Sequence, residues 1–179
     1  SKGNVYDENG NLVLCQNEKE SSNLPMDWAK KVVFQADLAP MSVNRFNIVN
    51  RIVEKKPFVT PMIDKDFIYY ENGSMKVKIN LSTGYIDSYV IDNKEYIKPG
   101  TGEILVIQDN CDSWGMTVSS YQKIKGRFKL ANSVQSAKIC GVDKKELDPV
   151  RIIESSELRT IVEASFVYSQ SSCNIRYTL

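Results

Sequence analysis

The amino-acid sequence predicts an all-β protein with a β-sandwich architecture. Apolar and polar residues alternate along several short segments, and turn residues separate these segments at intervals of roughly 8–12 residues, a spacing typical of sandwiches. β-Branched and aromatic residues, which favour strands, are concentrated in the same segments. A sustained helical period of 3.6 residues with caps is not found in any window, so helices are expected to contribute little.

The first 60 residues are expected to form a small β unit. Two short apolar segments, residues 5–6 and 12–14, flank a turn in which Asn9-Gly10 supplies the positive φ angles of a tight hairpin. Residues 16–23 are polar and predict a loop. Residues 27–33 are expected to form at most one short helical turn.

Two further strands are predicted before residue 60. Alternating side chains of residues 31–38 share one apolar face, and Pro40 ends this strand because proline cannot donate to a sheet ladder. Residues 43–49 predict the next strand. Residues 55–61 contain two prolines and are typical of a connector, so the domain boundary is placed at residue 60.

The second domain, residues 61–179, has the clearest strand signal. Apolar and polar side chains alternate along residues 75–81, as they do in a strand with one buried face. Turns are expected at residues 71–73, 82–84 and 92–93, where glycine or an Asp-Asn pair interrupts the apolar pattern. The other predicted strands are residues 67–70, 104–107, 123–130, 139–142, 150–153, 158–168 and 173–179.

The ends of the sequence predict a fragment of a longer protein. The chain begins without Met, and its last predicted strand continues to Leu179 without a terminating turn. We therefore expect the second domain to be truncated.

Charge and hydropathy exclude several classes of partner. Basic and acidic residues nearly balance, 23 against 22, and are interspersed, so nucleic-acid binding is not expected. Four basic residues alternate along one predicted strand and are expected to form its solvated face; they are Lys123, Lys125, Arg127 and Lys129. An apolar run of the ~18 residues that span a bilayer is not found, so no membrane partner is expected.

Histidine is absent from the chain. Its absence removes the Ser-His and Cys-His nucleophile pairs and nearly all catalytic zinc arrangements. The cysteines are far apart, with no C-x-x-C pair, so neither a zinc ribbon nor a dithiol redox site is expected; they are Cys15, Cys111, Cys140 and Cys173. Such cysteines suit a reducing compartment, and a cytoplasmic location is expected.

Five segments follow one another in a characteristic order. They are Val5-Tyr6-Asp7-Glu8-Asn9-Gly10, residues 31–40, Glu71-Asn72 with Thr83-Gly84-Tyr85-Ile86, Asp109-Asn110-Cys111-Asp112-Ser113-Trp114, and residues 150–162. This order resembles the large C-terminal β-region of glycoside hydrolase family 38, the α-mannosidase family. Met41 and Ser42 stand where that family usually has proline and glycine.

The resemblance implies part of a glycosidase rather than a complete enzyme. In the family, an upstream α/β barrel supplies an aspartate nucleophile and a zinc ion held by His and Asp ligands, and the β-domains brace that barrel. Residues 1–60 would then be a small linking β unit, and residues 61–179 the N-terminal part of a galactose-mutarotase-like supersandwich.

The same resemblance defines the expected cofactors and partners. It implies no catalytic residue, metal ligand or cofactor in this chain, because the zinc of the parent enzyme lies in the upstream domain. The implied partners are that catalytic domain and, through it, a mannose-containing glycan. Self-association into a homo-oligomer stays open.

Asp109, Asp112 and Trp114 are the candidate substrate-binding residues. By the resemblance they lie on a loop that faces the sugar cleft. A tryptophan ring can stack on the C–H face of a sugar, and carboxylates accept hydrogen bonds from sugar hydroxyls. The alternative is that Trp114 anchors the core while the two aspartates cap turns.

Two classes of function remain open from the sequence. The first is a non-catalytic β-domain of an α-mannosidase-like glycoside hydrolase. The second is an independent carbohydrate-binding or protein-interaction β-sandwich. The first class requires a coding sequence that continues upstream into a catalytic barrel, whereas the second does not.

Overall fold

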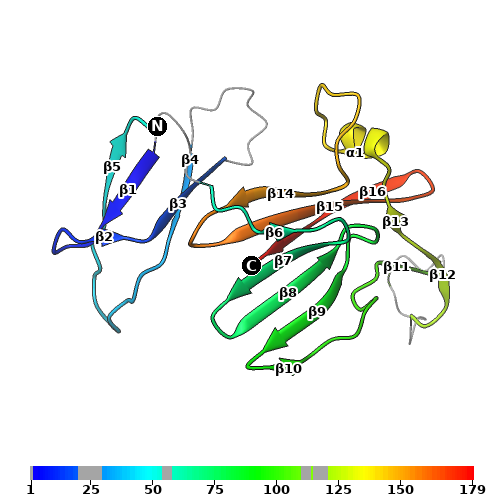
Figure 1. Cartoon of the computed structure of the whole chain (residues 1–179), viewed down its shortest axis with the longest axis horizontal. Helices are drawn as coiled ribbons and strands as arrows, with labels where there is room; N and C mark the ends of the chain where they lie inside the picture. The colour runs from blue at the N-terminus through cyan, green and yellow to red at the C-terminus, as the bar shows by residue number, and fades with distance from the viewer. Residues whose placement is uncertain (1, 20–29, 54–57, 110–113, 115–120) are drawn as a thin grey trace. The chain divides into compact units, whose positions relative to one another are not determined.

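The computed structural model describes residues 2–19, 30–53, 58–109, 114 and 121–179 (Figure 1). These residues form antiparallel sheets and one short helix, so the predicted all-β, sandwich-type class is confirmed. None of the described residues lies in a helix long and apolar enough to cross a membrane.

The chain divides into two compact units, and each is described by itself. Unit 1 comprises Ser1–Thr60, Ile153–Ile161 and Thr178–Leu179, and unit 2 comprises Pro61–Ile152 and Val162–Tyr177. The predicted domain boundary at residue 60 would place every later residue in the second domain. Residues 153–161 join unit 1 through side-chain bonds to its early residues, and Leu179 pairs with the backbone of Thr160 in this late segment.

Unit 1 contains a three-stranded antiparallel sheet with β1 (Lys2–Tyr6) at its centre. β1 pairs with β2 (Leu12–Val13) on one side and with β5 (Asn47–Arg51) on the other. The predicted hairpin between β1 and β2 is confirmed, and Gly10 supplies its positive φ of 81°. Val5 in β1 is fully buried.

A second hairpin in unit 1 corrects three sequence predictions. β3 (Cys15–Lys19) pairs with β4 (Lys30–Phe34), so residues 16–19 form a strand rather than the predicted loop. Residues 30–33 likewise extend as strand rather than helical turn, and residues 27–29 lie outside the described residues. β4 also ends at Phe34, four residues before the predicted end at Leu38.

The polar residues of β3 are buried because each finds a partner in unit 1. The Asn17 side chain accepts a bond from the Gly3 backbone N–H and donates one to the Gly3 carbonyl, both at 2.8 Å. The Asn17 side-chain amide thus makes the two hydrogen bonds that the backbone of a neighbouring strand would make with Gly3. Polarity at these positions therefore does not indicate a solvent-exposed loop.

The first sheet of unit 2 is an antiparallel meander in the order β10-β9-β8-β7-β6. Its strands are β6 (Met62–Ile63), β7 (Phe67–Asn72), β8 (Met75–Asn80), β9 (Ile86–Ile91) and β10 (Lys94–Glu95). Ile68, Val77 and Ile79 are buried on one face, which confirms the predicted alternation. The predicted turn at Asp92-Asn93 is also confirmed, with φ angles of 49° and 64°.

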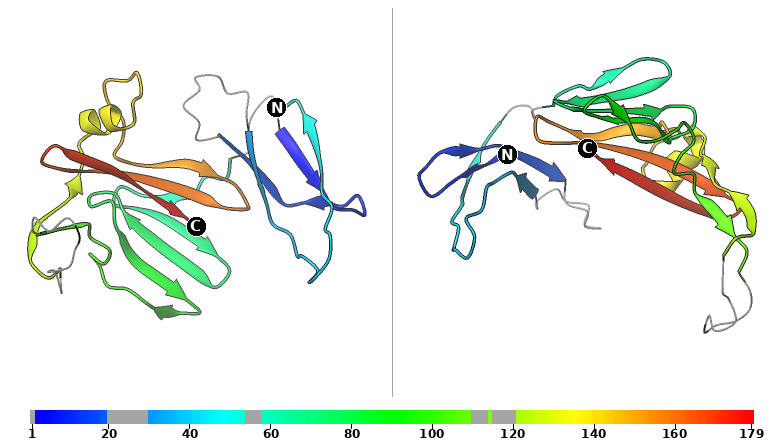
Figure 2. Two further views of the ribbon diagram at one scale, coloured as in Figure 1. Left: turned by 180° about the vertical axis from the view of Figure 1, so that it is seen from behind. Right: turned by 90° about the horizontal axis from the view of Figure 1, so that it is seen from below.

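The second sheet is built around β15 (Thr160–Tyr168). β15 pairs with β13 (Lys129–Leu130), β14 (Val150–Ser155) and β16 (Ser171–Thr178). A separate two-stranded ribbon joins β11 (Leu105–Ile107) to β12 (Ile124–Arg127). Figure 2 shows the meander and the strands around β15 as two layers.

The two layers meet at Gly84 and Tyr85. The Tyr85 ring stacks on the ring of Phe166 in β15, with centroids 4.9 Å apart. Gly84 has a φ of 75°, and a Cβ there would lie 2.7 Å from Leu130 and 2.8 Å from Phe166. The Tyr177 hydroxyl donates to the Gly84 carbonyl at 2.8 Å. Glycine is therefore required at position 84 by both conformation and space.

The single described helix overturns one strand prediction. α1 (Ser133–Ile139) ends at the apolar segment 139–142 that predicted a strand. A capping box starts it: the Asn132 side chain accepts from the Gln135 backbone N–H at 2.8 Å, and the Gln135 side chain accepts from the Asn132 N–H at 3.0 Å. This N-x-x-Q pattern is the local signal for the helix.

Candidate functional site

The three sequence candidates occupy the connection between β11 and β12. Asp109 is exposed two residues after the end of β11 at Ile107, and Trp114 is 87% exposed. Asp112 lies outside the described residues. The core alternative for Trp114 is therefore wrong: its indole is at the surface. Whether it contacts a sugar stays a prediction.

A buried polar cluster in unit 2 was not predicted from the sequence. Glu163 on β15 is 3% exposed and forms ion pairs with Arg151 and Arg176. The Arg176 Nε lies 2.5 Å from Glu163 Oε2. Arg151 also donates to the sulfur of Cys140, at the end of α1, at 2.8 Å.

This cluster is suited to holding α1 on the sheet rather than to chemistry. The Ser136 hydroxyl in α1 lies 3.3 Å from the Ser165 hydroxyl, which donates to Asn174 at 2.7 Å. Each hydroxyl is thus hydrogen-bonded, and the chain has no histidine to activate it as a nucleophile. The sequence gives no signal for the cluster, because its members come from four different segments.

A second polar cluster lies within unit 1. The Arg159 guanidinium forms two bonds of 2.6 Å to the carboxylate of Glu18, which is 4% exposed. This hydrogen-bonded contact with Glu18 raises the pKa of Arg159 above its ordinary value. Gln16 also donates to Glu18 at 2.9 Å and accepts a bond from Ser156. Three hydrogen bonds thus hold the carboxylate in place, and its negative charge is paired with Arg159.

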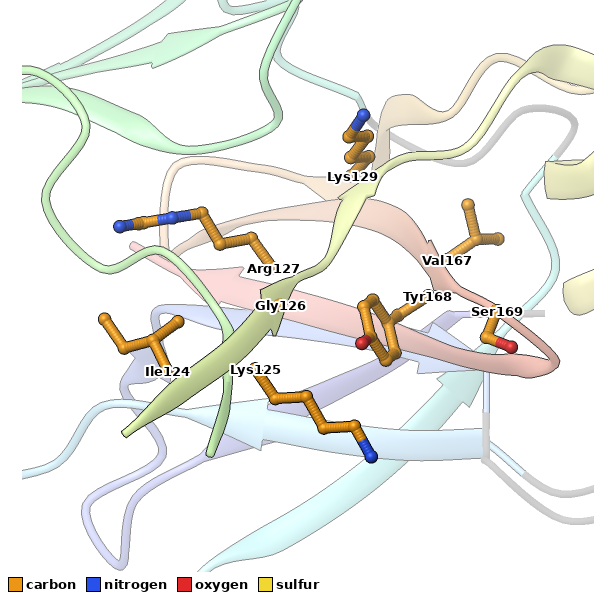
Figure 3. Close-up of a pocket in the computed structure, with 8 residues that line it drawn as sticks. All are labelled: Ile124, Lys125, Gly126, Arg127, Lys129, Val167, Tyr168 and Ser169. Carbon is orange, nitrogen blue, oxygen red and sulfur yellow. The ribbon is translucent and has the colours of Figure 1, made fainter. Parts of the chain in front are cut away.

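Unit 2 contains a pocket of about 590 Å³ beside β12 (Figure 3). It forms where the chain leaves β12, continues into β13 and pairs with the end of β15. Its lining residues are Ile124, Lys125, Gly126, Arg127, Lys129, Val167, Tyr168 and Ser169.

Gly126 shapes this pocket by leaving room for the ring of Tyr168. A Cβ at position 126 would lie 2.3 Å from Tyr168 Cε2. The Tyr168 ring also contacts the ring of Phe128, with centroids 5.7 Å apart. An isolated glycine in a strand is the sequence signal for such a close approach, although it does not identify the partner.

The chemistry of the pocket favours binding over catalysis. Three of its lining side chains are cationic, and none is a carboxylate. A general base for the Ser169 hydroxyl is thus missing from the lining residues. The pocket offers positive charge, an aromatic ring and a hydroxyl.

Comparison with known proteins identifies no family for this chain. No family model matches the chain, and neither the curated proteins nor the solved structures include a significant match to it.

Proposed function

We propose that this chain is a non-catalytic β-domain of an α-mannosidase-like glycoside hydrolase, which braces the catalytic barrel and lines part of the sugar cleft. The supporting observation is the ordered series of five motifs, together with the role of one of them in the fold. The Thr83-Gly84-Tyr85-Ile86 element supplies both the turn and the ring through which the two layers of unit 2 meet. A motif with this role is expected to persist in a domain family.

The proposal assigns the chemistry to another part of the parent protein. The chain has no histidine, so a zinc ion held by His and Asp ligands cannot be built from its residues. The upstream catalytic domain is the proposed partner and holder of the zinc, and a mannose-containing glycan is the proposed substrate. The residues of this chain would position and shield that cleft.

The proposed cleft contribution rests on the segment between β11 and β12. Trp114 is exposed, as a ring that stacks on a sugar must be, and Asp109 is exposed on the same connection. The described cysteines Cys15, Cys140 and Cys173 are free of disulfides, which suits the cytoplasmic location that we propose.

The second candidate is an independent carbohydrate-binding or protein-interaction β-sandwich. The 87% exposure of Trp114 favours it, because an exposed indole can bind a sugar without any catalytic partner. Homo-oligomerisation is compatible with either candidate.

The coding sequence upstream of this chain distinguishes the two candidates. The first candidate requires a continuous reading frame that encodes a barrel with an aspartate nucleophile and His and Asp zinc ligands. A reading frame that starts next to residue 1 would exclude it. The purified chain alone is expected to hydrolyse no aryl α-mannoside, with or without zinc; turnover that a substitution within the chain abolishes would contradict the assignment.

A further inference from the structure

The pocket beside β12 lies in the most one-sided charge environment of the sequence. Residues 113–142 contain no aspartate or glutamate, although the whole chain has 22 acidic residues among 179. The same segment contains five basic residues, which are Lys123, Lys125, Arg127, Lys129 and Lys138. Three of the five line the pocket. Balanced net charge therefore conceals a local positive patch.

This patch is only partly neutralised by the surrounding structure. Arg127 forms an ion pair with Glu103. Lys125 and Lys129 take part in no ion pair within the described ranges 2–19, 30–53, 58–109 and 121–179. Two ammonium groups thus keep their charge available to a ligand at the pocket.

The cationic side chains of the pocket extend in different directions. In Figure 3 the Lys125 side chain extends to the same side of β12 as the ring and hydroxyl of Tyr168, whereas Arg127 and Lys129 point away from that ring. Ser169 follows Tyr168 in the chain and has a φ of 52°. Lys125 is therefore placed for direct contact with a ligand, and Lys129 adds to the field around it.

Protection of a sheet edge explains only part of this arrangement. Lysines on an edge strand oppose pairing with other chains, and this accounts for a row of exposed cations. It does not account for a glycine at position 126 that admits an aromatic ring beside Lys125. A ring next to a cation instead suits a ligand with an apolar ring and a negative group.

We propose that this pocket binds a small ring-shaped molecule carrying a phosphate or sulfate ester. The ester oxygens contact the Lys125 ammonium, and the ring of the ligand packs against Tyr168. Lysine suits a tetrahedral oxyanion, since its ammonium is a compact point charge with three donors. The site does not depend on the proposed role in a glycosidase.

Nuclear magnetic resonance of the whole ¹⁵N-labelled chain tests the proposal with three probes. Phenyl phosphate and phenyl sulfate present both groups, and phenol presents the ring alone. We expect phenyl phosphate or phenyl sulfate to shift the amide resonances of residues 124–129 and 167–169, with a Kd of about 1 mM or below. Phenol is expected to bind at least about fivefold more weakly. The two esters show which oxyanion is preferred.

Lys125→Gln and Lys123→Gln each remove one positive charge, so comparing them distinguishes direct contact with Lys125 from a general electrostatic attraction. Lys125→Gln should weaken phenyl phosphate binding about fivefold, and Lys125→Arg should restore most of the affinity. Lys123→Gln removes the same charge two residues away, outside the pocket lining, and should change the Kd less than about twofold.

Gly126→Ala tests the ring contact without removing a charge. Its Cβ displaces the Tyr168 ring, so phenyl phosphate should bind no better than inorganic phosphate does. Equal weakening by Lys123→Gln and Lys125→Gln would overturn the proposal, as would shifts confined to residues outside the pocket. If the affinity of the chain for oligonucleotides rises steadily with their length, the pocket proposal is wrong and the positive patch binds nucleic acid instead.

Discussion

Arg159 and Glu18 form a two-point ion pair although they are 141 positions apart in the sequence. Both N–O distances are 2.6 Å, and the geometry is the parallel fork that arginine makes with a carboxylate. The pair brings the turn between β14 and β15 to strand β3. Unit 1 is therefore complete only when a late segment of the chain has reached its early strands.

Arg159→Met should lower the free energy of unfolding by about 2–4 kcal/mol. The substitution leaves the buried carboxylate of Glu18 without its counter-ion. We place the value below the cost for a fully buried pair, because the Arg159 side chain is 23% exposed. Urea unfolding measures the change.

A surface pair provides the matched control. Lys76 and Glu71 are 3.0 Å apart, and their side chains are 53% and 64% exposed. Lys76→Met should cost no more than about 0.5 kcal/mol. An equal effect of the two substitutions would show that the Arg159 contact has no special importance for stability.

Gly84→Ala should destabilise unit 2 by about 2–4 kcal/mol, because an L-residue is strained at positive φ and the new methyl group meets Leu130 and Phe166. Gly102→Ala is the control. Gly102 has a φ of 85° with open space around its Cβ position, so it should lose only the conformational term of about 1 kcal/mol. Thermal unfolding of both variants separates the packing contribution from the backbone contribution. Similar costs would mean that the two layers can move apart at Gly84.

Tyr177 makes the stability of unit 2 sensitive to alkaline pH. Burial raises the pKa of the Tyr177 hydroxyl from 10.0 to about 12. The folded state therefore binds the proton more tightly than the unfolded state does. The resulting stability is fully present below pH 10 and is lost as the pH rises from 10 to about 12.

Tyr177→Phe isolates this contribution from other groups that titrate in the same range. The variant should show a shallower loss of stability between pH 10 and about 12, and at neutral pH it should be about 1–2 kcal/mol less stable, because the Gly84 carbonyl loses its donor. Urea unfolding at several pH values measures both effects. Identical pH profiles of variant and wild type would show that Tyr177 ionises equally well in both states.

Trp114→Ala should change the free energy of unfolding by no more than about 0.5 kcal/mol, because the indole is 87% exposed. In the glycosidase that we propose as the parent protein, the same change should raise the KM for a mannoside while leaving the melting temperature unchanged. Tyr96→Ala removes an exposed aromatic ring that lies outside the connection between β11 and β12, and it should leave the KM unchanged. An unchanged KM in the Trp114 variant would remove the indole from the proposed cleft.

Local patterns predicted the strands of unit 2 well. The alternating segment 75–81 contains β8, which ends at Asn80, and Asp92-Asn93 turns the chain as expected. These features depend on side chains and backbone angles within a few residues of each other. Information of that range is present in any short window of sequence.

The incorrect predictions concern residues whose structure depends on partners far away in the sequence. Gln16, Asn17 and Glu18 predicted a loop because they are polar, yet each is buried by a bond to a residue far along the chain or on another strand. The pocket escaped prediction for the same reason, since Gly126 and Tyr168 are 42 positions apart. α1 was missed because a helix of seven residues is too short to show a period.

The amide of Asn17 has a chemical consequence for the lifetime of unit 1. Its nitrogen donates to the Gly3 carbonyl while its oxygen accepts from the Gly3 N–H. Deamidation would replace that nitrogen with a carboxylate oxygen and set two acceptors against each other in a buried position. The fold in turn restrains the side chain from reaching the following backbone nitrogen, which deamidation requires. Release of β1 from Asn17 and deamidation of Asn17 would therefore each promote the other.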